Sequence, residues 1–315
     1  MKLILTDRFF NYFLSPEDIN VGEKEEVYRS MAGGGKNMRL IEARGLTKEF
    51  RIFSRSEGVM GAFRDLFYRK YRILRAVDNI DFAVDRGEMV GYIGANGAGK
   101  STTIKMLTGI LVPTEGGVTV NGYVPHKDRE SYTRGIGVVF GQRSQLWWDI
   151  AVIESFKLLR RIYDVSKEDF NRRLKQFDDI LGLNSFLNLP VRKLSLGQRM
   201  RCDLAAALLH NPAILFLDEP TIGLDVLAKS KIRDFLKEIN NEYKTTVILT
   251  THDLGDIEAL CPRVAIIDQG KMLYDGSVEN LYSQWGQDKL EDIVKRIYMG
   301  QKPESDSAGG GFNFV

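Results

Sequence analysis

A glycine-rich segment that ends in lysine and serine carries the clearest chemistry in this chain. Residues 94–101 read Gly-Ala-Asn-Gly-Ala-Gly-Lys-Ser, which fits the pattern G-x-x-x-x-G-K-[S/T]. Glycines let backbone N–H groups converge on phosphate oxygens, and a following helix N-terminus adds positive potential. Lys100 can reach the β- and γ-phosphates of a nucleotide, and the Ser101 hydroxyl can bind Mg²⁺. The residues expected to contact a nucleotide here are Gly94, Asn96, Gly97, Gly99, Lys100, Ser101 and Thr102.

The residues on either side of this loop supply the local structure that the motif requires. Residues 89–93 form an apolar run typical of a buried strand, and residues 102–107 continue as a helix-like run. This order of strand, glycine loop and helix favours a phosphate-binding loop. A glycine-rich turn that binds no nucleotide is the alternative.

Two adjacent carboxylates follow another apolar run. Asp218 and Glu219 come directly after residues 213–217, which are typical of a parallel strand. The carboxyl ends of such strands form the edge at which α/β sheets bind ligands. Asp218 can hold Mg²⁺ through water, and Glu219 can polarise the water that attacks a γ-phosphate. An acidic turn at the end of a strand is the alternative.

A second anion site is suggested further along the chain. Residues 194–200 read Leu-Ser-Leu-Gly-Gln-Arg-Met and precede a strongly helical run at 202–209. Ser195 fits the N-cap position, which would by itself account for the residue. The functional interpretation is that this helix N-terminus points at phosphate.

The remaining pattern predicts the elements that position these residues. Apolar runs separated by helical segments indicate a sheet covered on both faces; they lie at 136–140, 213–217, 246–249 and 264–267. The sequence therefore predicts an α/β fold. We expect a P-loop NTPase core with a mixed sheet, an antiparallel β subdomain with the edge of a hairpin at 118–122, and an inserted helical subdomain at about 143–200.

Composition limits the possible partners. The 315 residues include 44 basic and 42 acidic ones, a net charge of +2, so no nucleic-acid partner is expected. Cys202 and Cys261 lack metal-ligand spacing and are expected to be packing residues of a reduced cytosolic chain. No apolar run approaches the ~20 residues that span a bilayer, so a membrane part would belong to another chain.

Several motifs occur together in one order. The glycine loop, the segment 194–200 and the carboxylate pair resemble the motifs of nucleotide-binding subunits of ABC (ATP-binding cassette) transporters, over roughly residues 38–285. The resemblance implies that residues 94–101 are the Walker A loop and residues 214–219 the Walker B strand. It adds nucleotide contacts from the family signature and the D-loop, namely Ser195, Gly197, Gln198 and Asp225.

The same resemblance implies which residues carry out ATP hydrolysis. Gln142 looks like the glutamine that senses Mg²⁺ and the partner. His252 looks like the switch histidine that contacts the γ-phosphate, with an ordinary buried histidine as the alternative. The implied catalytic residues are Glu219, His252, Lys100 and Gln142, and the implied Mg²⁺ ligands are Ser101, Gln142 and Asp218.

The sequence departs from the family pattern at some positions. Leu196 stands where glycine is commonest in the signature, and Val226 stands where proline is frequent after the D-loop aspartate. The adenine-stacking aromatic is expected to be Phe50, from its sequence context, with Tyr71 as the alternative.

The resemblance also implies partners and a mechanism. Two cassettes face each other head to tail, each ATP lies between Walker A of one and the signature of the other, and hydrolysis opens the dimer. A homodimer is expected at the cytoplasmic face of the cell membrane, driving export through separate integral membrane subunits that dock near Gln142. Trp147 and Trp148 either receive a membrane-subunit helix or are buried in the helical subdomain. Alternative functions are a soluble ABC-type ATPase of an assembly complex and a nucleotide-binding protein without turnover.

The chain ends and one insertion complete the expected organisation. Residues 1–37 form an N-terminal extension that is either native or foreign to the domain, residues 38–288 the ATPase domain, and residues 289–315 a C-terminal helix and flexible tail. The basic stretch 51–75 contains an amphipathic helical pattern at 59–67. That helix either packs on its own domain or contacts anionic lipid or a partner.

Overall fold

Two sheets form the framework of the protein. The computed structural model describes residues 39–53, 71–141, 143–286 and 289–301. The smaller sheet is antiparallel with strand order β2-β1-β4; its strands are β1 Arg39–Phe53, β2 Tyr71–Asp85 and β4 Glu115–Val120.

The larger sheet is mixed, with strand order β5-β6-β7-β3-β8-β9. All neighbouring strands are parallel except the last pair, β8 and β9. Its strands are β3 Met89–Gly94, β5 Ile136–Phe140, β6 Ile214–Asp218, β7 Thr246–Thr251, β8 Arg263–Asp268 and β9 Lys271–Ser277. Every residue of β3 and β7 is buried, and each strand contains a run of apolar residues, 89–93 in β3 and 247–249 in β7.

Helices cover both faces of the mixed sheet, and the hydrophobic core is divided accordingly. One core cluster lies between the two sheets around α4 Lys100–Leu107, and α5 Arg129–Thr133 joins it through Tyr132. The other cluster lies on the opposite face. It packs the helices α6 Val152–Ile162, α7 Lys167–Leu181, α8 Leu196–Leu208, α9 Val226–Tyr243, α10 Leu254–Leu260, α11 Val278–Trp285 and α12 Leu290–Tyr298.

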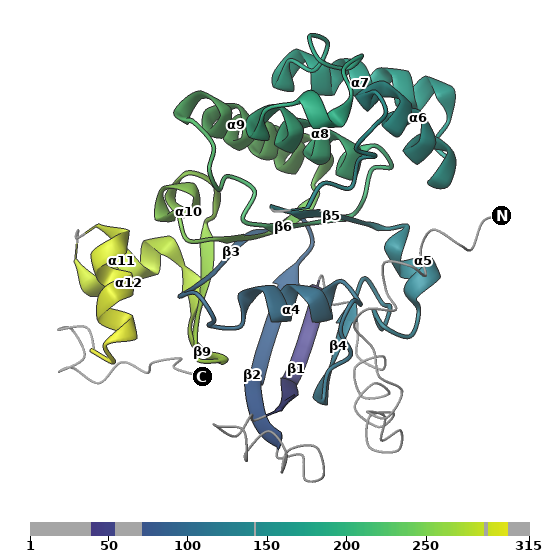
Figure 1. Ribbon diagram of the computed structural model, residues 1–315. Coiled ribbons are helices and arrows are strands. Elements are labelled where there is room, and N and C mark those ends of the chain that lie inside the picture. The colour runs from purple at the N-terminus through teal and green to yellow at the C-terminus, as the bar shows by residue number, and fades with distance from the viewer. Residues whose placement is uncertain (1–38, 54–70, 142, 287–288, 302–315) are drawn as a thin grey trace, which may run out of the picture.

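The layers are clear in Figure 1, where α6–α9 lie above the mixed sheet and the antiparallel sheet lies below it. Helices α6 and α7 and the short 3₁₀ helix Val191–Lys193 stand between β5 and β6 in the chain, so the helical subdomain is inserted into the α/β core as expected. The mixed sheet, the antiparallel sheet and the inserted helices confirm the predicted fold class.

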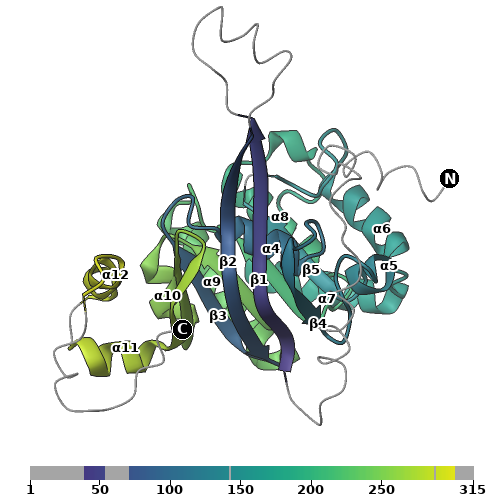
Figure 2. The same cartoon turned by 90° about the horizontal axis from the view of Figure 1, so that it is seen from below.

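The antiparallel sheet differs from expectation in two respects. Residues 51–53 and 71–75, expected within a helix-bearing basic insertion, extend β1 and β2, and Arg51 pairs with Ile73. Figure 2 shows these two strands as a long pair that projects beyond the rest of the fold. The strand β4 is an edge strand, but its partner is the distant β1 rather than a hairpin neighbour. The helical pattern at 59–67 and the extension 1–37 lie outside the described residues.

Candidate nucleotide-binding site

The phosphate loop joins β3 to α4 and has a backbone that requires glycine. Gly97 and Gly99 have φ angles of +83° and +110°, which L side chains rarely adopt. A Cβ atom on Gly99 would lie 2.5 Å from the Ala76 carbonyl oxygen, and one on Gly94 would lie 2.6 Å from that of Ile267. The loop therefore packs closely against Ala76 of β2 and Ile267 near the end of β8 before α4 begins.

Lys100 is the first residue of α4, and its side chain turns back under the loop. The residue is 5% exposed, and Nζ donates to the carbonyl oxygens of Gly94 at 2.7 Å and Ala95 at 3.2 Å. Burial lowers the pKa of Lys100, while the carboxylates of Glu219 and Asp218 act to raise it. The ammonium group thus lies inside the loop, close to the two predicted acidic residues.

Asp218 joins the phosphate loop to two strands of the mixed sheet. Its Oδ1 accepts a hydrogen bond from Ser101 Oγ at 3.2 Å and another from Thr250 Oγ1 at 2.6 Å. A hydroxyl and a carboxylate are hard oxygen ligands of the kind that Mg²⁺ prefers, so the side chains of Ser101 and Asp218 fit a Mg²⁺ site. The third predicted ligand, Gln142, lies outside the described residues.

Glu219 and His252 meet just beyond the ends of β6 and β7. Glu219 has a left-handed φ of +55°, and its N–H donates to the Thr250 carbonyl oxygen at 2.9 Å. His252 Nδ1 lies 3.3 Å from Glu219 Oε1, and the His252 side chain is 54% exposed. The exposed ring excludes the alternative of an ordinary buried histidine.

The residues of the predicted signature build the start of α8. Ser195 Oγ accepts from Gln198 N–H at 3.2 Å, and Gln198 Oε1 accepts from Ser195 N–H at 2.9 Å, which is a capping box. A Cβ atom on Gly197 would lie 3.2 Å from Cβ of Ala228 on α9, so the helices α8 and α9 approach closely here. The hydrogen bonds between Ser195 and Gln198 stay within α8 and satisfy its first N–H groups.

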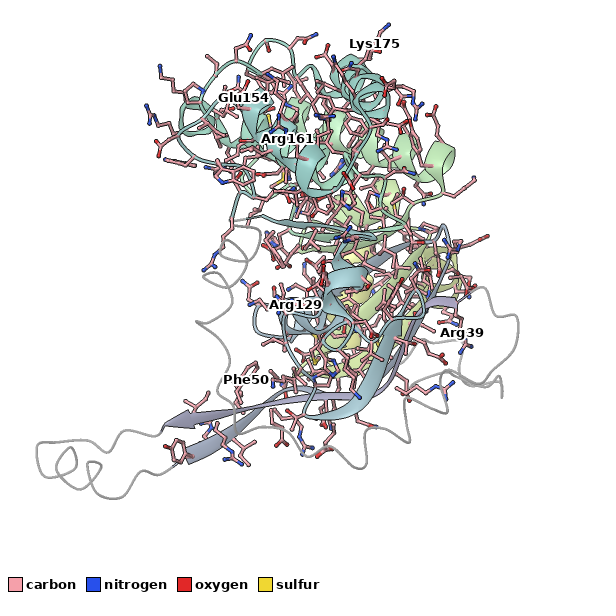
Figure 3. All side chains as sticks on the ribbon, turned by 90° about the vertical axis from the view of Figure 1, so that its right-hand side faces the viewer. Arg39, Phe50, Arg129, Glu154, Arg161 and Lys175 are labelled. Carbon is pink, nitrogen blue, oxygen red and sulfur yellow. The ribbon has the colours of Figure 1, made fainter. Side chains whose placement is uncertain are left out.

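The predicted D-loop and adenine residues lie on other segments. Asp225 caps α9 by accepting from Ala228 N–H at 2.8 Å. Phe50 lies on β1, packs partly against the core between the sheets, and has Lys48 Nζ 5.4 Å from its ring centre. Figure 3 places Phe50 on the projecting strand pair, away from the helical layer that carries Glu154. The alternative, Tyr71, begins β2 and is 56% exposed.

The two adjacent tryptophans have different environments. Trp147 is partly buried against the larger core cluster, whereas Trp148 is 51% exposed. The guanidinium carbon of Arg199 lies 5.6 Å from the Trp148 ring centre, a distance at which a cation–π contact forms. Of the two, Trp147 thus fits the alternative of burial, and Trp148 offers the exposed ring that an interface would need.

Sequence reasoning missed Thr250, which organises the carboxylate pair. Thr250 is buried near the end of β7, next to β6, where it bonds the Asp218 side chain and the Glu219 backbone. A signal existed in the sequence, because Thr250 and Thr251 directly precede His252. A hydroxyl at the carboxyl end of a strand beside an acidic residue is a candidate orienting group.

The site so defined is that of a phosphate-loop nucleotide-binding protein. A sequence profile described as "ABC transporter" matches residues 77–222. NatA, an ABC transporter ATP-binding protein of Bacillus subtilis, is 31% identical over 227 residues, which span 72% of this chain and 91% of that protein. The methionine import ATP-binding protein MetN 2 of Enterococcus faecalis is 34% identical over 82% of this chain and 70% of its own length.

Two solved structures with similar folds are also an ATP-binding subunit and an ATP-binding cassette. An ATP-binding subunit of an ABC transporter matches with a TM-score of 0.69 and 26% identity, covering 82% of this chain and 99% of that chain. A dimeric ATP-binding cassette in a post-hydrolysis state, bound to ADP and Pi, matches with a TM-score of 0.63 and 27% identity, covering 76% and 98% of the two chains.

The chain therefore belongs to the family of ABC transporter ATP-binding proteins. Members of this family bind ATP, in general with Mg²⁺, and in general hydrolyse it; they form dimers and work with membrane subunits. Within the described residues, no helix has the length and apolar character needed to cross a membrane.

Proposed function

We propose that this chain binds ATP and Mg²⁺ at the phosphate loop and hydrolyses the ATP. We further propose that it acts as a homodimer at the cytoplasmic face of the cell membrane and powers export through separate integral membrane subunits. One observation carries the proposal: the phosphate loop, Asp218, Glu219 and His252 converge at the carboxyl ends of β3, β6 and β7.

Each proposed role follows from this arrangement. Lys100 and the loop N–H groups bind the β- and γ-phosphates, while Ser101 and Asp218 hold Mg²⁺, which neutralises phosphate charge when bound. Glu219 accepts a hydrogen bond from the attacking water, and His252, 3.3 Å from Glu219, contacts the γ-phosphate. The second copy contributes its signature and D-loop residues to the same nucleotide. Gln142 is the third residue of the Mg²⁺ site. Phe50 stacks on the adenine ring, which stabilises the bound nucleotide by about 1 kcal/mol.

The role of Glu219 is tested by measuring phosphate release. Glu219→Gln keeps the shape of the side chain but removes the charge that orients water. We expect turnover to fall at least about a hundredfold, with ATP binding retained and the ATP-bound dimer stabilised. Turnover at the wild-type rate would exclude Glu219 as the residue that activates water.

The phosphate-loop assignment is tested by direct titration with ATP and Mg²⁺. Lys100→Ala removes the buried ammonium group and is expected to weaken ATP binding at least about tenfold. Lys105→Ala is the matched control, because Lys105 lies in the last turn of the same helix. Tight ATP binding by Lys100→Ala would contradict the assignment.

The transport partners and direction need separate experiments. Transmembrane proteins are expected to copurify with the chain from detergent extracts, whereas soluble scaffold proteins would support an assembly ATPase. The relatives include both an import protein and LnrL, a linearmycin resistance ATP-binding protein of Bacillus subtilis that is 35% identical over 69% of this chain. In inside-out membrane vesicles, ATP should fill the lumen with the exported compound, detected by untargeted mass spectrometry; ATP-driven emptying would indicate import.

A further inference from the structure

A buried carboxylate near the proposed catalytic residues has no role in the mechanism above. Asp256 lies in the first turn of α10 and is 0% exposed. It accepts hydrogen bonds from the hydroxyl of Thr221, from Thr251 Oγ1 at 3.4 Å and from Arg233 Nε at 2.7 Å. Arg233 Nη2 also lies 2.5 Å from the carboxylate, so the charge is paired.

The partners of Asp256 come from three different segments. Thr221 stands two residues after Glu219, and Thr251 stands immediately before His252. Arg233 lies on α9, the helix that Asp225 caps. The Asp256 side chain therefore connects three backbone segments. They carry Glu219, which is proposed to activate water, His252, which is proposed to contact the γ-phosphate, and the helix that follows the D-loop.

A purely structural role, holding α10 on α9, does not account for all of these bonds. A second ion pair, Lys229 Nζ to Asp253 Oδ2 at 2.5 Å, already joins the same two helices. Thr221 and Thr251 add nothing to that attachment, yet their hydroxyls complete the coordination of Asp256. Burying a carboxylate costs free energy unless the carboxylate is fully hydrogen-bonded and its charge is paired. The hydroxyl donors to Asp256 come from the segments next to Glu219 and His252.

We propose that Asp256 is a positioning residue for ATP hydrolysis, which sets Glu219 and His252 at their working distance and links them to α9. This inference rests on the proposed function above. Because small displacements of a water-activating group cost much of the rate, loss of Asp256 acts on the chemical step. Asp256 makes no hydrogen bond to the phosphate loop, so ATP binding is preserved.

The experiment is steady-state ATP hydrolysis by the full-length chain, with ATP affinity titrated separately. Asp256→Asn keeps the size of the side chain but removes its ion pair with Arg233. We expect kcat to fall about tenfold while KM for ATP stays within about twofold. Thr221→Val, which is isosteric and removes one hydrogen bond to Asp256, should lower kcat in the same direction by a smaller factor.

A matched control separates positioning from general loss of an ion pair. Asp275 accepts two hydrogen bonds from Arg263 in a bidentate ion pair. Arg263 begins β8, so this pair lies at the opposite end of the mixed sheet from the site. Asp275→Asn should leave kcat unchanged. If Asp256→Asn does not fold, Thr221→Val decides, because that change introduces no unpaired charge.

The outcomes also distinguish this inference from the proposed function. If Glu219→Gln retains turnover, the proposed hydrolysis mechanism fails. If Glu219→Gln is inactive but Asp256→Asn and Thr221→Val keep the wild-type kcat, the mechanism stands and the positioning role is overturned. A rise in KM that matches the fall in kcat would equally overturn it.

Discussion

Asp203 is a second buried carboxylate, and its chemistry differs from that of Asp256. It lies within α8, is 4% exposed, and accepts from Ser144 Oγ at 2.8 Å and Gln145 N–H at 3.1 Å. Both donors are neutral, and burial raises the pKa of Asp203 to about 6 against the opposing effect of these hydrogen bonds. The side chain holds the loop that follows Gln142 against the signature helix.

The raised pKa of Asp203 predicts a pH dependence of stability. The unfolded chain releases this proton near pH 4 and the folded chain at about pH 6, so the folded state binds the proton more tightly. The stability contributed by the protonated form is present below about pH 4 and is lost as pH rises through about 6. This linkage amounts to roughly 3 kcal/mol at neutral pH.

Asp203→Asn should remove that dependence because the amide does not titrate. We expect the variant, relative to wild type, to gain up to about 3 kcal/mol in unfolding free energy between about pH 4 and pH 7. Urea denaturation at both pH values measures the difference. A difference between variant and wild type that is constant with pH would show that Asp203 does not titrate in this range.

At the scale of elements, the start of α8 combines two functions that can be separated. The capping box of Ser195 and Gln198 stabilises the helix by satisfying its first N–H groups. The proposed function also requires this helix end to face the phosphates of the partner's ATP. Ser195→Ala should therefore cost about 1 kcal/mol in unfolding free energy and also weaken ATP-dependent dimerisation.

Ser195→Asp distinguishes the two functions of the helix end. Aspartate is a good N-cap, so the unfolding free energy should return to near the wild-type value. Its negative charge would repel phosphate, so dimerisation in ATP should be lost, as followed by light scattering. Wild-type dimerisation of Ser195→Asp would show that this helix end does not approach the nucleotide.

The sequence allowed much of the fold to be predicted, because local signals were strong there. The buried strands β3, β6 and β7 each contain an apolar run, and the spacing of glycine, lysine and serine in the phosphate loop is a specific sequence pattern. The extension of β1 and β2 was missed because only the cross-strand register, such as Arg51 opposite Ile73, makes these basic residues strand-like. That pairing joins segments far apart in the chain and leaves no periodic signal.

For a related reason, the sequence predicted the motif residues of the site but not the residues that orient them. Motif residues such as Asp218 lie where the pattern placed them, but residues that orient them carry no motif. Asp256 looks like an ordinary acidic residue in the first turn of a helix, where charge is favourable even when exposed. Its complete burial depends on α9 and on the turn at Thr221, which no local pattern reveals.

At the scale of the whole molecule, each catalytic site of the proposed dimer is built from residues of both copies. The similar cassette with ADP and Pi is dimeric, and the residues Ser195 and Lys100 are proposed to face the same nucleotide from opposite copies. Two variants that are inactive alone should then complement each other. Lys100→Ala damages the phosphate loop, and Ser195→Asp damages the signature.

In a mixed dimer, the intact phosphate loop of the Ser195→Asp copy meets the intact signature of the Lys100→Ala copy. One of the two sites is thereby restored, while the other carries both substitutions. Because Ser195→Asp copies are not expected to pair with one another in ATP, at least half of the dimers are mixed, and an equimolar mixture should recover between about a quarter and a half of wild-type ATP turnover. A mixture no more active than the sum of its components would mean that both residues act within one copy, and the head-to-tail arrangement would be wrong.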